Sequence, residues 1–187
     1  VQHPLIRKLS QMDAPLVQAQ WNHQTSSSSK NHSKPLEEVT RLIQNSKMCF
    51  GSFVVDNNDE GSNNDSFILC GFILQYDNGV IGMLHVEPEY RRRGHATALL
   101  EKSTHALFQE RETTAPARND ACSGVAYIMD GNDASEAVFS KLGWVKEDPT
   151  IRKKTGNRRA KRKWILLNQD TVTSSWNETT PQLSTSS

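Results

Sequence analysis

The spacing of hydrophobic and polar residues changes several times along the chain, and the changes mark successive elements. Residues 6–9 alternate as a short strand does. Ser10, followed three residues later by Asp13, resembles a helix-capping pair in which Asp takes the place of the usual Glu. The pattern therefore predicts a strand and then a helix that reaches Trp21.

The next segment is polar and then becomes periodic again. Residues 22–34 are rich in Ser, Asn and His and predict a loop. Pro35 is a favourable start for a second helix. The buried face of that helix is predicted from the apolar residues at helical spacing, which are Leu36, Val39, Leu42 and Ile43.

From residue 50 the pattern is that of strands. Residues 50–55 and 67–74 predict the two strands of a hairpin, and the polar residues 57–66 predict a long tip between them. The turn signal at 77–79 precedes a further strand over 80–86. An antiparallel arrangement is expected for this part of the chain.

A strongly amphipathic helix is expected from about Gly94, before a loop over 112–123. Residues 125–129 are apolar at every position, which is typical of a central strand buried on both faces. A short helix over 132–142 is expected to end at Gly143. The buried face of the long helix is predicted to hold Ala96, Leu99, Leu100, Ser103 and Leu107.

Two final strands are expected at 144–146 and 164–167, before a Ser/Thr-rich tail over 169–187 that we expect to be disordered. The order of elements is strand, two helices, three strands, helix, strand, helix and two strands. This order predicts a mixed α/β fold in a single domain.

Composition agrees with a single soluble domain. The 187 residues include 35% hydrophobic and 23% charged residues, and the formal net charge is +1. The cysteines, Cys49, Cys70 and Cys122, have neither metal-ligand nor disulfide-framework spacing, so no metal site is expected. Cys49 and Cys70 lie in apolar runs and predict buried free thiols, which favours a reducing compartment.

Residues 152–163 form a basic segment that leaves several roles open. A solvated loop, a nuclear-import signal and attraction to an acidic acceptor are all compatible with it, whereas direct nucleic-acid binding would call for interleaved aromatic residues. We expect a cytoplasmic protein, with a nuclear location through this loop or a mitochondrial one as alternatives. Its cations are Arg152, Lys153, Lys154, Arg158, Arg159, Lys161, Arg162 and Lys163.

The segment 87–97 has the chemistry of a phosphate site. A strand ends before Pro88, and a short Arg-rich loop then opens the long helix. The first turn of a helix has N–H groups without intrahelical partners, and the helix dipole favours anions there. Gly94 and Ala96 remove side-chain bulk where a ligand would approach.

The same residues resemble the acetyl-coenzyme A motif of the GNAT acyltransferases. Arg91, Gly94 and Ala96 occupy the three defining positions of its Arg/Gln-x-x-Gly-x-Gly/Ala loop, after Val86-x-Pro88-Glu89-Tyr90. Residues 130–144 resemble the second motif of the family, and the opening 6–14 resembles its first strand and helix. The resemblance thus implies one domain over roughly residues 4–168. Within the superfamily, Pro88 to Gly94 looks most similar to the glycine N-acyltransferase-like (FR47-like) branch, whose members usually carry an additional N-terminal half.

The resemblance implies a fold, a cofactor and a reaction. The fold would be a mostly antiparallel sheet of six to seven strands with about four helices, in which strand 80–86 splays from strand 125–129. Acetyl-CoA or another acyl-CoA would be the co-substrate, and an amine acceptor would attack its thioester directly. A small-molecule amine or amino acid is expected as acceptor before a protein amine. The implied cofactor-binding residues are His85, Val86, Arg91, Arg92, Arg93, Gly94, His95, Ala96, Thr97, Asn132 and Ser135.

Two departures from the family pattern leave the catalytic residues unassigned. The usual base position is Val80, and the usual acid, a Tyr, is Phe139. His85 is expected on the opposite strand face from Val80, and His95 and His105 on the surface of the long helix. Two functions therefore stay open, an N-acyltransferase and a coenzyme A-binding module with little catalysis.

Overall fold

A computed structural model describes residues 4–25, 35–56, 67–114, 124–129, 131–147 and 161–166. The predicted hairpin tip, Cys122, Asp130, most of the basic segment and the tail 169–187 lie outside these ranges. Within them, no helix is both long enough and apolar enough to cross a membrane.

Seven strands of the described chain form one sheet in the order β1-β2-β3-β4-β5-β7-β6. Neighbouring strands are antiparallel except β4 and β5, which are parallel. The strands are β1 (Leu5–Lys8), β2 (Phe50–Val55), β3 (Phe67–Gln75), β4 (Ile81–Val86), β5 (Gly124–Met129), β6 (Trp144–Lys146) and β7 (Lys161–Leu166).

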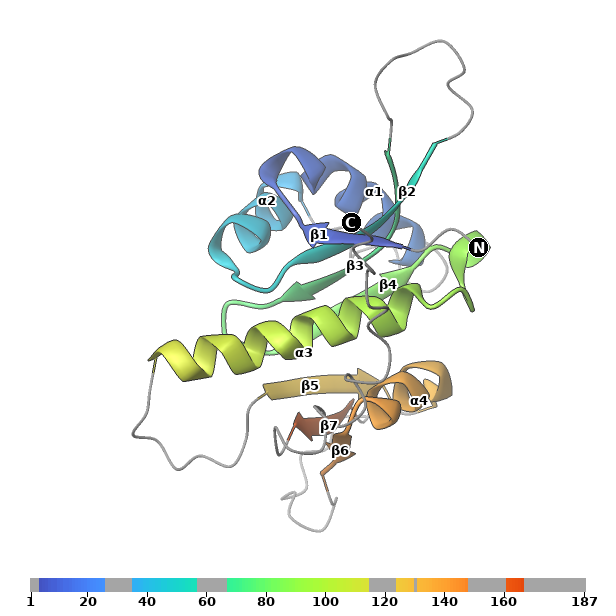
Figure 1. The fold of residues 1–187 in the computed structure, drawn as a ribbon. Coiled ribbons are helices and arrows are strands. Elements are labelled where there is room, and N and C mark those ends of the chain that lie inside the picture. The colour runs from blue at the N-terminus through green and yellow to red at the C-terminus, as the bar shows by residue number, and fades with distance from the viewer. Residues whose placement is uncertain are drawn as a thin grey trace, which may run out of the picture.

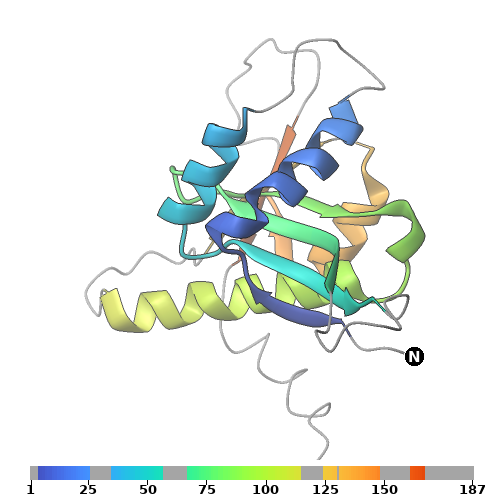
Figure 2. The same ribbon diagram turned by 90° about the horizontal axis from the view of Figure 1, so that it is seen from above.

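Four α-helices cover this sheet from its two sides. In Figures 1 and 2, α1 (Ala14–Thr25) and α2 (Leu36–Asn45) lie on one side, and α3 (His95–Thr114) crosses the other. The fourth helix, α4 (Asp133–Lys141), packs beside β6. The 3₁₀ turns Gln11–Asp13 and Pro88–Tyr90 precede α1 and α3. The predicted mixed α/β class and the mostly antiparallel sheet are confirmed.

The core has one hydrophobic cluster on each face of the sheet. On the α1/α2 face, Trp21 and Val39 pack with Phe72. On the α3/α4 face, Leu99 and Leu100 pack with residues of β4 to β7. The β4 strand lies between both clusters, so a change in its path alters the surfaces on both sides of the sheet.

Several sequence-based boundaries were wrong. Residues 22–25 continue α1, residues 112–114 continue α3, and residues 161–163 of the basic segment belong to β7. In each case the polar sequence suggested a loop, while backbone hydrogen bonding to a neighbouring turn or strand extends the element.

Two burial expectations were also wrong. Leu36, at the first position of α2, is 40% exposed. Tyr127 in β5 is 42% exposed, so β5 is not buried on both faces. Cys49 and Cys70 are buried free thiols, as expected.

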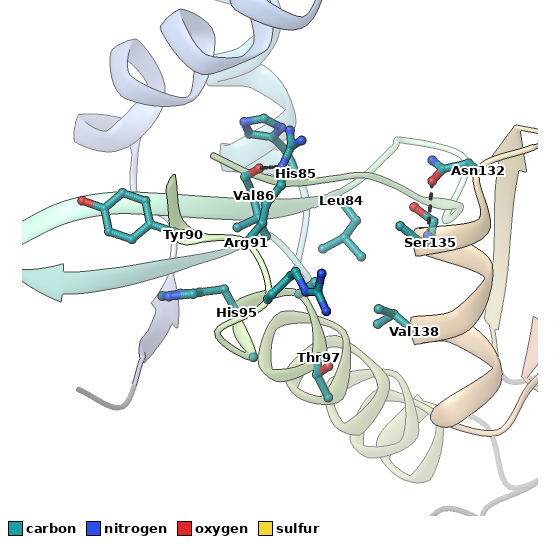
Figure 3. Close-up of a pocket in the computed structure, with 14 residues that line it drawn as sticks. Leu84, His85, Val86, Tyr90, Arg91, His95, Thr97, Asn132, Ser135 and Val138 are labelled. Carbon is teal, nitrogen blue, oxygen red and sulfur yellow. Dashed lines mark hydrogen bonds between the residues drawn. The ribbon is translucent and has the colours of Figure 1, made fainter. Parts of the chain in front are cut away.

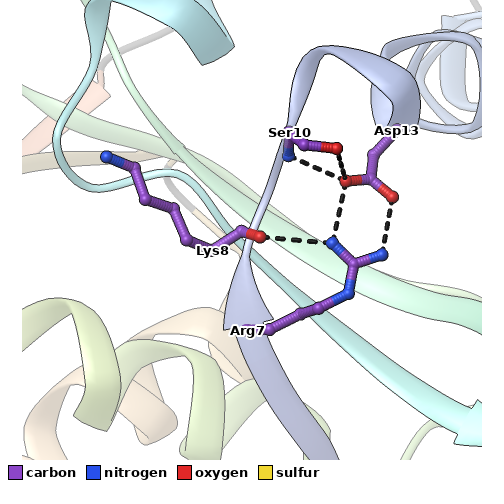
Figure 4. A network of polar contacts seen from close by, with 4 residues as sticks. All are labelled: Arg7, Lys8, Ser10 and Asp13. Carbon is purple, nitrogen blue, oxygen red and sulfur yellow. Dashed lines mark hydrogen bonds and ion pairs between the residues drawn. The ribbon is translucent and has the colours of Figure 1, made fainter.

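The capping pair predicted at Ser10 and Asp13 is present and forms part of a larger polar network (Figure 4). One carboxylate oxygen of Asp13 accepts hydrogen bonds from the Ser10 backbone N–H and hydroxyl, each at 2.7 Å. Both carboxylate oxygens also accept from the Arg7 guanidinium, at 2.7 and 2.9 Å. The guanidinium in turn lies over the Phe53 ring, 3.9 Å from its centroid. The network fastens the start of α1 to β1.

This network makes the stability of the domain depend on pH. Burial acts to raise the pKa of Asp13, but the bonds from Arg7 and Ser10 outweigh it and lower the pKa from 3.8 to about 2. A carboxylate with a lowered pKa stabilises the fold above its unfolded pKa, and the contribution is lost as pH falls through the folded value. The Asp13→Asn variant should therefore have a lower thermal midpoint than wild type at neutral pH, with the difference shrinking between pH 4 and 2.

Thermal unfolding at a series of pH values measures this difference. Asp133→Asn, which neutralises an exposed carboxylate at the start of α4, is the matched control and should show little loss of midpoint. A deficit of Asp13→Asn that stays constant down to pH 2 would mean that packing, and not the ion pair, explains it.

A candidate coenzyme A site between two helix N-termini

A bulge in β4 changes the direction of the strand halfway along its length. Gly82 pairs with Leu74 and His85 with Phe72, so two residues of β4, Met83 and Leu84, stand opposite the single residue between Phe72 and Leu74. Met83 has φ = 48°, the left-handed region that a non-glycine residue rarely adopts. This extra residue is the mark of a β-bulge, which bends the strand that carries it.

Beyond the bulge, β4 and β5 separate. The only registered pair between these two parallel strands is Ile81 with Ala126, before the bulge. The rest of β4, from Gly82 to Val86, has no registered partner in β5. The splay that the family resemblance implied is therefore present, and it leaves a strand edge beside a gap in the sheet.

The Arg-rich loop after β4 carries two left-handed residues. Arg92 has φ = 61° and Gly94 has φ = 89°. A Cβ atom built on Gly94 would meet nothing within 4 Å, so the space beside it is open. Ala98 donates its N–H to the Gly94 carbonyl at 2.9 Å, so Gly94 is the N-cap residue directly before α3. The next backbone N–H groups lack intrahelical partners and suit an anion.

A second helix begins on the other side of the gap. Asn132 caps α4 by accepting a hydrogen bond from the Ser135 backbone N–H at 3.2 Å, shown dashed in Figure 3. Gly131 before it has φ = 81°. The positive ends of the α3 and α4 dipoles therefore line the same gap, which favours a ligand with several negative charges.

These elements line a half-open cavity of about 520 Å³ (Figure 3). It contains all the residues that the sequence proposed for cofactor binding except Arg93, whose guanidinium lies 5.7 Å from the Tyr90 ring centroid instead. The lining residues from that proposal are His85, Val86, Arg91, Arg92, Gly94, His95, Ala96, Thr97, Asn132 and Ser135.

The sequence analysis missed four further lining residues, which are Leu84, Tyr90, Ala134 and Val138. A spacing argument could have found two of them. Leu84 lies two residues before Val86 on a strand, and Val138 lies three residues after Ser135 on a helix, so each shares a face with a proposed residue. Apolar groups at these places give the cavity a hydrophobic wall beside its cationic loop.

The bulge also corrects the expected position of His85. Gly82 and His85 face the same side of the sheet, since a Cβ on Gly82 would lie 2.3 Å from a Tyr76 ring carbon, while the His85 ring packs 5.4 Å from Phe72. The extra residue at Met83 shifts the alternation of side chains by one position, so His85 lies on the face of Gly82 and Val80. The prediction that His85 lies on the opposite face was therefore wrong. Burial lowers the pKa of His85, despite Glu87 at 3.6 Å from its Nε2 atom.

The prediction for His95 was wrong in another way. His105 is exposed as expected, but His95 is only 3% exposed. Its Nδ1 atom is joined to the Ser52 hydroxyl of β2 by a hydrogen bond of 2.7 Å. His95 is the first residue of α3, where the helix meets the sheet, so the periodicity of the later turns does not describe its surroundings.

The two family positions for proton transfer hold no ionisable group. Val80 precedes β4. Phe139 is buried against Trp144 and Trp164, with ring centroids 5.1 and 6.2 Å away, and does not line the cavity. Among the described residues, no group of three His, Cys, Asp or Glu side chains could hold a metal ion.

Comparison with known proteins finds one matching family and many solved structures with a similar fold. Residues 62–153 match the family described as FR47-like protein. No curated protein sequence matches the chain.

Three solved structures illustrate the structural similarity. The yncA putative acetyltransferase from Salmonella typhimurium with acetyl-CoA has a TM-score of 0.58 and 14% identity, covering 88% of this chain and 94% of its own. A GNAT family acetyltransferase from Bacillus cereus has a TM-score of 0.57 and 14% identity, covering 89% and 99%. The ribosomal-protein-S18-alanine N-acetyltransferase from Escherichia coli has a TM-score of 0.52 and 16% identity, covering 88% and 94%.

The left-handed backbone at Met83 generates a direct test of the bulge. Met83→Gly and Met83→Ala remove nearly the same side chain, so their difference isolates the backbone. At φ = 48° glycine should be the more stable of the two by about 1 kcal/mol. Urea unfolding measures the difference. In a regular strand alanine would be the more stable variant, so that order would exclude the bulge.

Proposed function

We propose that this chain, which has the fold of the GNAT acetyltransferases, transfers an acyl group from an acyl-CoA, acetyl-CoA above all, to an amine. The observation that carries the proposal is the cavity that joins the splayed edge of β4 to the N-termini of α3 and α4. Coenzyme A has a diphosphate, which suits helix N-termini, and a pantetheine arm with amide groups, which suits an open strand edge.

The residues present fit such a ligand. The Arg91 backbone N–H already donates to the Pro88 carbonyl at 3.3 Å. The N–H groups of residues 92–96 and the Arg91 and Arg92 side chains would therefore hold the diphosphate. Arg91 also donates from Nε to the Val86 carbonyl at 3.0 Å, so its side chain is folded back against the end of β4. Leu84 and Val138 offer apolar contacts for the methyl groups of the arm. Asn132 and Ser135 would lie along the arm on the α4 side.

The reaction would be a direct transfer within a ternary complex. The neutral amine nitrogen attacks the thioester carbonyl carbon, a C–N bond forms and the C–S bond breaks. Coenzyme A leaves as a thiolate, which takes up, through solvent, the proton that the nitrogen loses. The chain contributes mainly by positioning the two substrates and by offering backbone N–H groups at the splayed strand to the developing oxyanion. No side chain is assigned as base or acid.

We infer a small-molecule amine or an amino acid as acceptor, in keeping with the glycine N-acyltransferase-like branch that residues 88–94 resemble. A protein amine is the alternative, because the Escherichia coli structure is that of an enzyme named for a ribosomal protein.

A second candidate function is a coenzyme A-binding module with little catalysis. One observation favours it, namely that Val80 and the buried Phe139 occupy the family positions for the base and the acid. The two functions differ in one outcome, which is release of free coenzyme A from acetyl-CoA with a panel of amines.

The diphosphate position can be tested at Gly94. Gly94→Glu and Gly94→Gln add side chains of similar size and impose the same backbone strain at φ = 89°, so they differ in charge alone. Both should weaken binding of coenzyme A, and Gly94→Glu should weaken it at least about tenfold more, because its carboxylate would face the phosphates. Isothermal titration calorimetry measures both. Equal affinities of the two variants would place the diphosphate elsewhere.

The pH dependence of the rate tests the absence of an enzyme base. Because Val80 and Phe139 cannot accept a proton, kcat/KM should rise with pH until the acceptor amine is deprotonated, and the midpoint should move when an amine of different pKa is used. A midpoint that stays fixed for all acceptors would reveal a base in the protein. His85→Gln and Glu87→Gln would then be the first variants to measure.

A further inference from the structure

The loop between β4 and α3 needs contacts that hold its shape. The backbone of Arg92 is in the left-handed region. For an arginine, this conformation persists only where the surrounding structure fixes the chain. A loop that relaxed at Arg92 would turn its N–H groups away from the cavity. The contacts at the two ends of the loop therefore determine the fraction of ligand-free molecules in which the loop is arranged to bind an anion.

Both ends of the loop are fixed to neighbouring strands. At its start, the Glu87 backbone N–H donates to the Cys70 carbonyl of β3 at 2.9 Å. At its end, the His95 side chain reaches Ser52 of β2 through the 2.7 Å bond between Nδ1 and Oγ. Ser52 is fully buried and His95 nearly so, and a hydrogen bond between buried groups is stronger than one exposed to solvent.

The surroundings of His95 favour a neutral ring with a fixed orientation. Burial, followed by the nearby charge of Arg93, lowers the pKa of His95. Its ring meets the Tyr90 ring edge-on at 5.9 Å, and the Arg93 guanidinium lies 5.7 Å from the centroid of Tyr90. Tyr90 therefore lies between two neighbours from the end of the loop, His95 and Arg93.

We propose that Ser52 and His95 are positioning residues of the cofactor site, whose hydrogen bond holds the diphosphate loop ready in the ligand-free protein. The inference rests on the proposed function for the identity of the ligand. Ser52 lies on β2 and does not line the cavity, so its effect on the ligand passes entirely through His95 and the first turn of α3. When only a fraction of the molecules has the loop in place, the apparent dissociation constant rises by the inverse of that fraction.

The affinity of variants for coenzyme A tests the proposal. Ser52→Ala and His95→Leu remove the hydrogen bond. His95→Asn keeps a side-chain amide close to the position of Nδ1. The first two should weaken binding about tenfold, as expected for loss of one buried hydrogen bond. The double variant Ser52→Ala/His95→Leu should be no weaker than the weaker single variant, because both remove the same contact. His95→Asn should restore part of the affinity.

Ser103→Ala is the matched control. Ser103 is a fully buried serine of α3 that donates to the Leu99 carbonyl at 3.0 Å and does not line the cavity. Its replacement should leave the affinity for coenzyme A unchanged, even where it lowers the thermal midpoint. Equal loss of affinity in Ser52→Ala and Ser103→Ala would mean that general destabilisation explains both, and would overturn the proposal.

Hydrogen–deuterium exchange of the ligand-free protein separates this inference from the proposed function. Amides in peptides spanning residues 87–99 should exchange faster in Ser52→Ala than in wild type or Ser103→Ala. If Ser52→Ala does not fold, His95→Leu gives the same comparison. Unchanged exchange in the variant overturns the anchoring role. If exchange is faster in Ser52→Ala but the wild type binds no coenzyme A, the anchoring role of Ser52 and His95 is supported and coenzyme A is excluded as the ligand.

Discussion

The left-handed backbone of Met83 in β4 is the constraint on which the rest of the site depends. A strand that continued regularly past Gly82 would pair with β5 along its whole length and close the sheet. The bulge at Met83 bends β4 away from β5 after the single pair of Ile81 with Ala126. The cavity lies in the gap that this leaves between the two strands. The same bulge decides which face of the sheet each later residue of β4 occupies.

The cavity combines features that would be unfavourable without a ligand. Two helix N-termini and two arginines bring positive potential to one place, and the left-handed backbone of Arg92 adds strain. Such a concentration of like charge and strain is typical of a site that recognises an anion. The apolar wall of Leu84 and Val138 is at odds with a site for a simple phosphate ion and agrees with a longer, partly apolar ligand.

Much of this arrangement could be predicted from local sequence. The helix start at Gly94, the cap at Asn132 and the capping pair of Ser10 and Asp13 depend on neighbouring residues alone, and each is present. The positions of His85 and His95 could not be obtained in this way. The first depends on a one-residue bulge, which alternation along the strand cannot reveal, and the second on a bond to Ser52, 43 positions away in the chain.

The burial of β5 shows the same limit. An apolar run predicts a strand buried on both faces, yet Tyr127 is exposed, because α1 and α2 pack over the other half of the sheet. Which half a pair of helices covers is a property of tertiary packing. Phe139 likewise looked like a substituted catalytic position, and the structure makes it part of the core between Trp144 and Trp164.

A crystal structure of the protein with coenzyme A would test the central claim most directly. The account predicts the diphosphate oxygens within hydrogen-bonding distance of the backbone N–H groups of residues 92–96, and the pantetheine arm in the gap between β4 and β5. A ligand bound outside this gap, or a regular β4 that pairs with β5 beyond Ala126, would contradict the account.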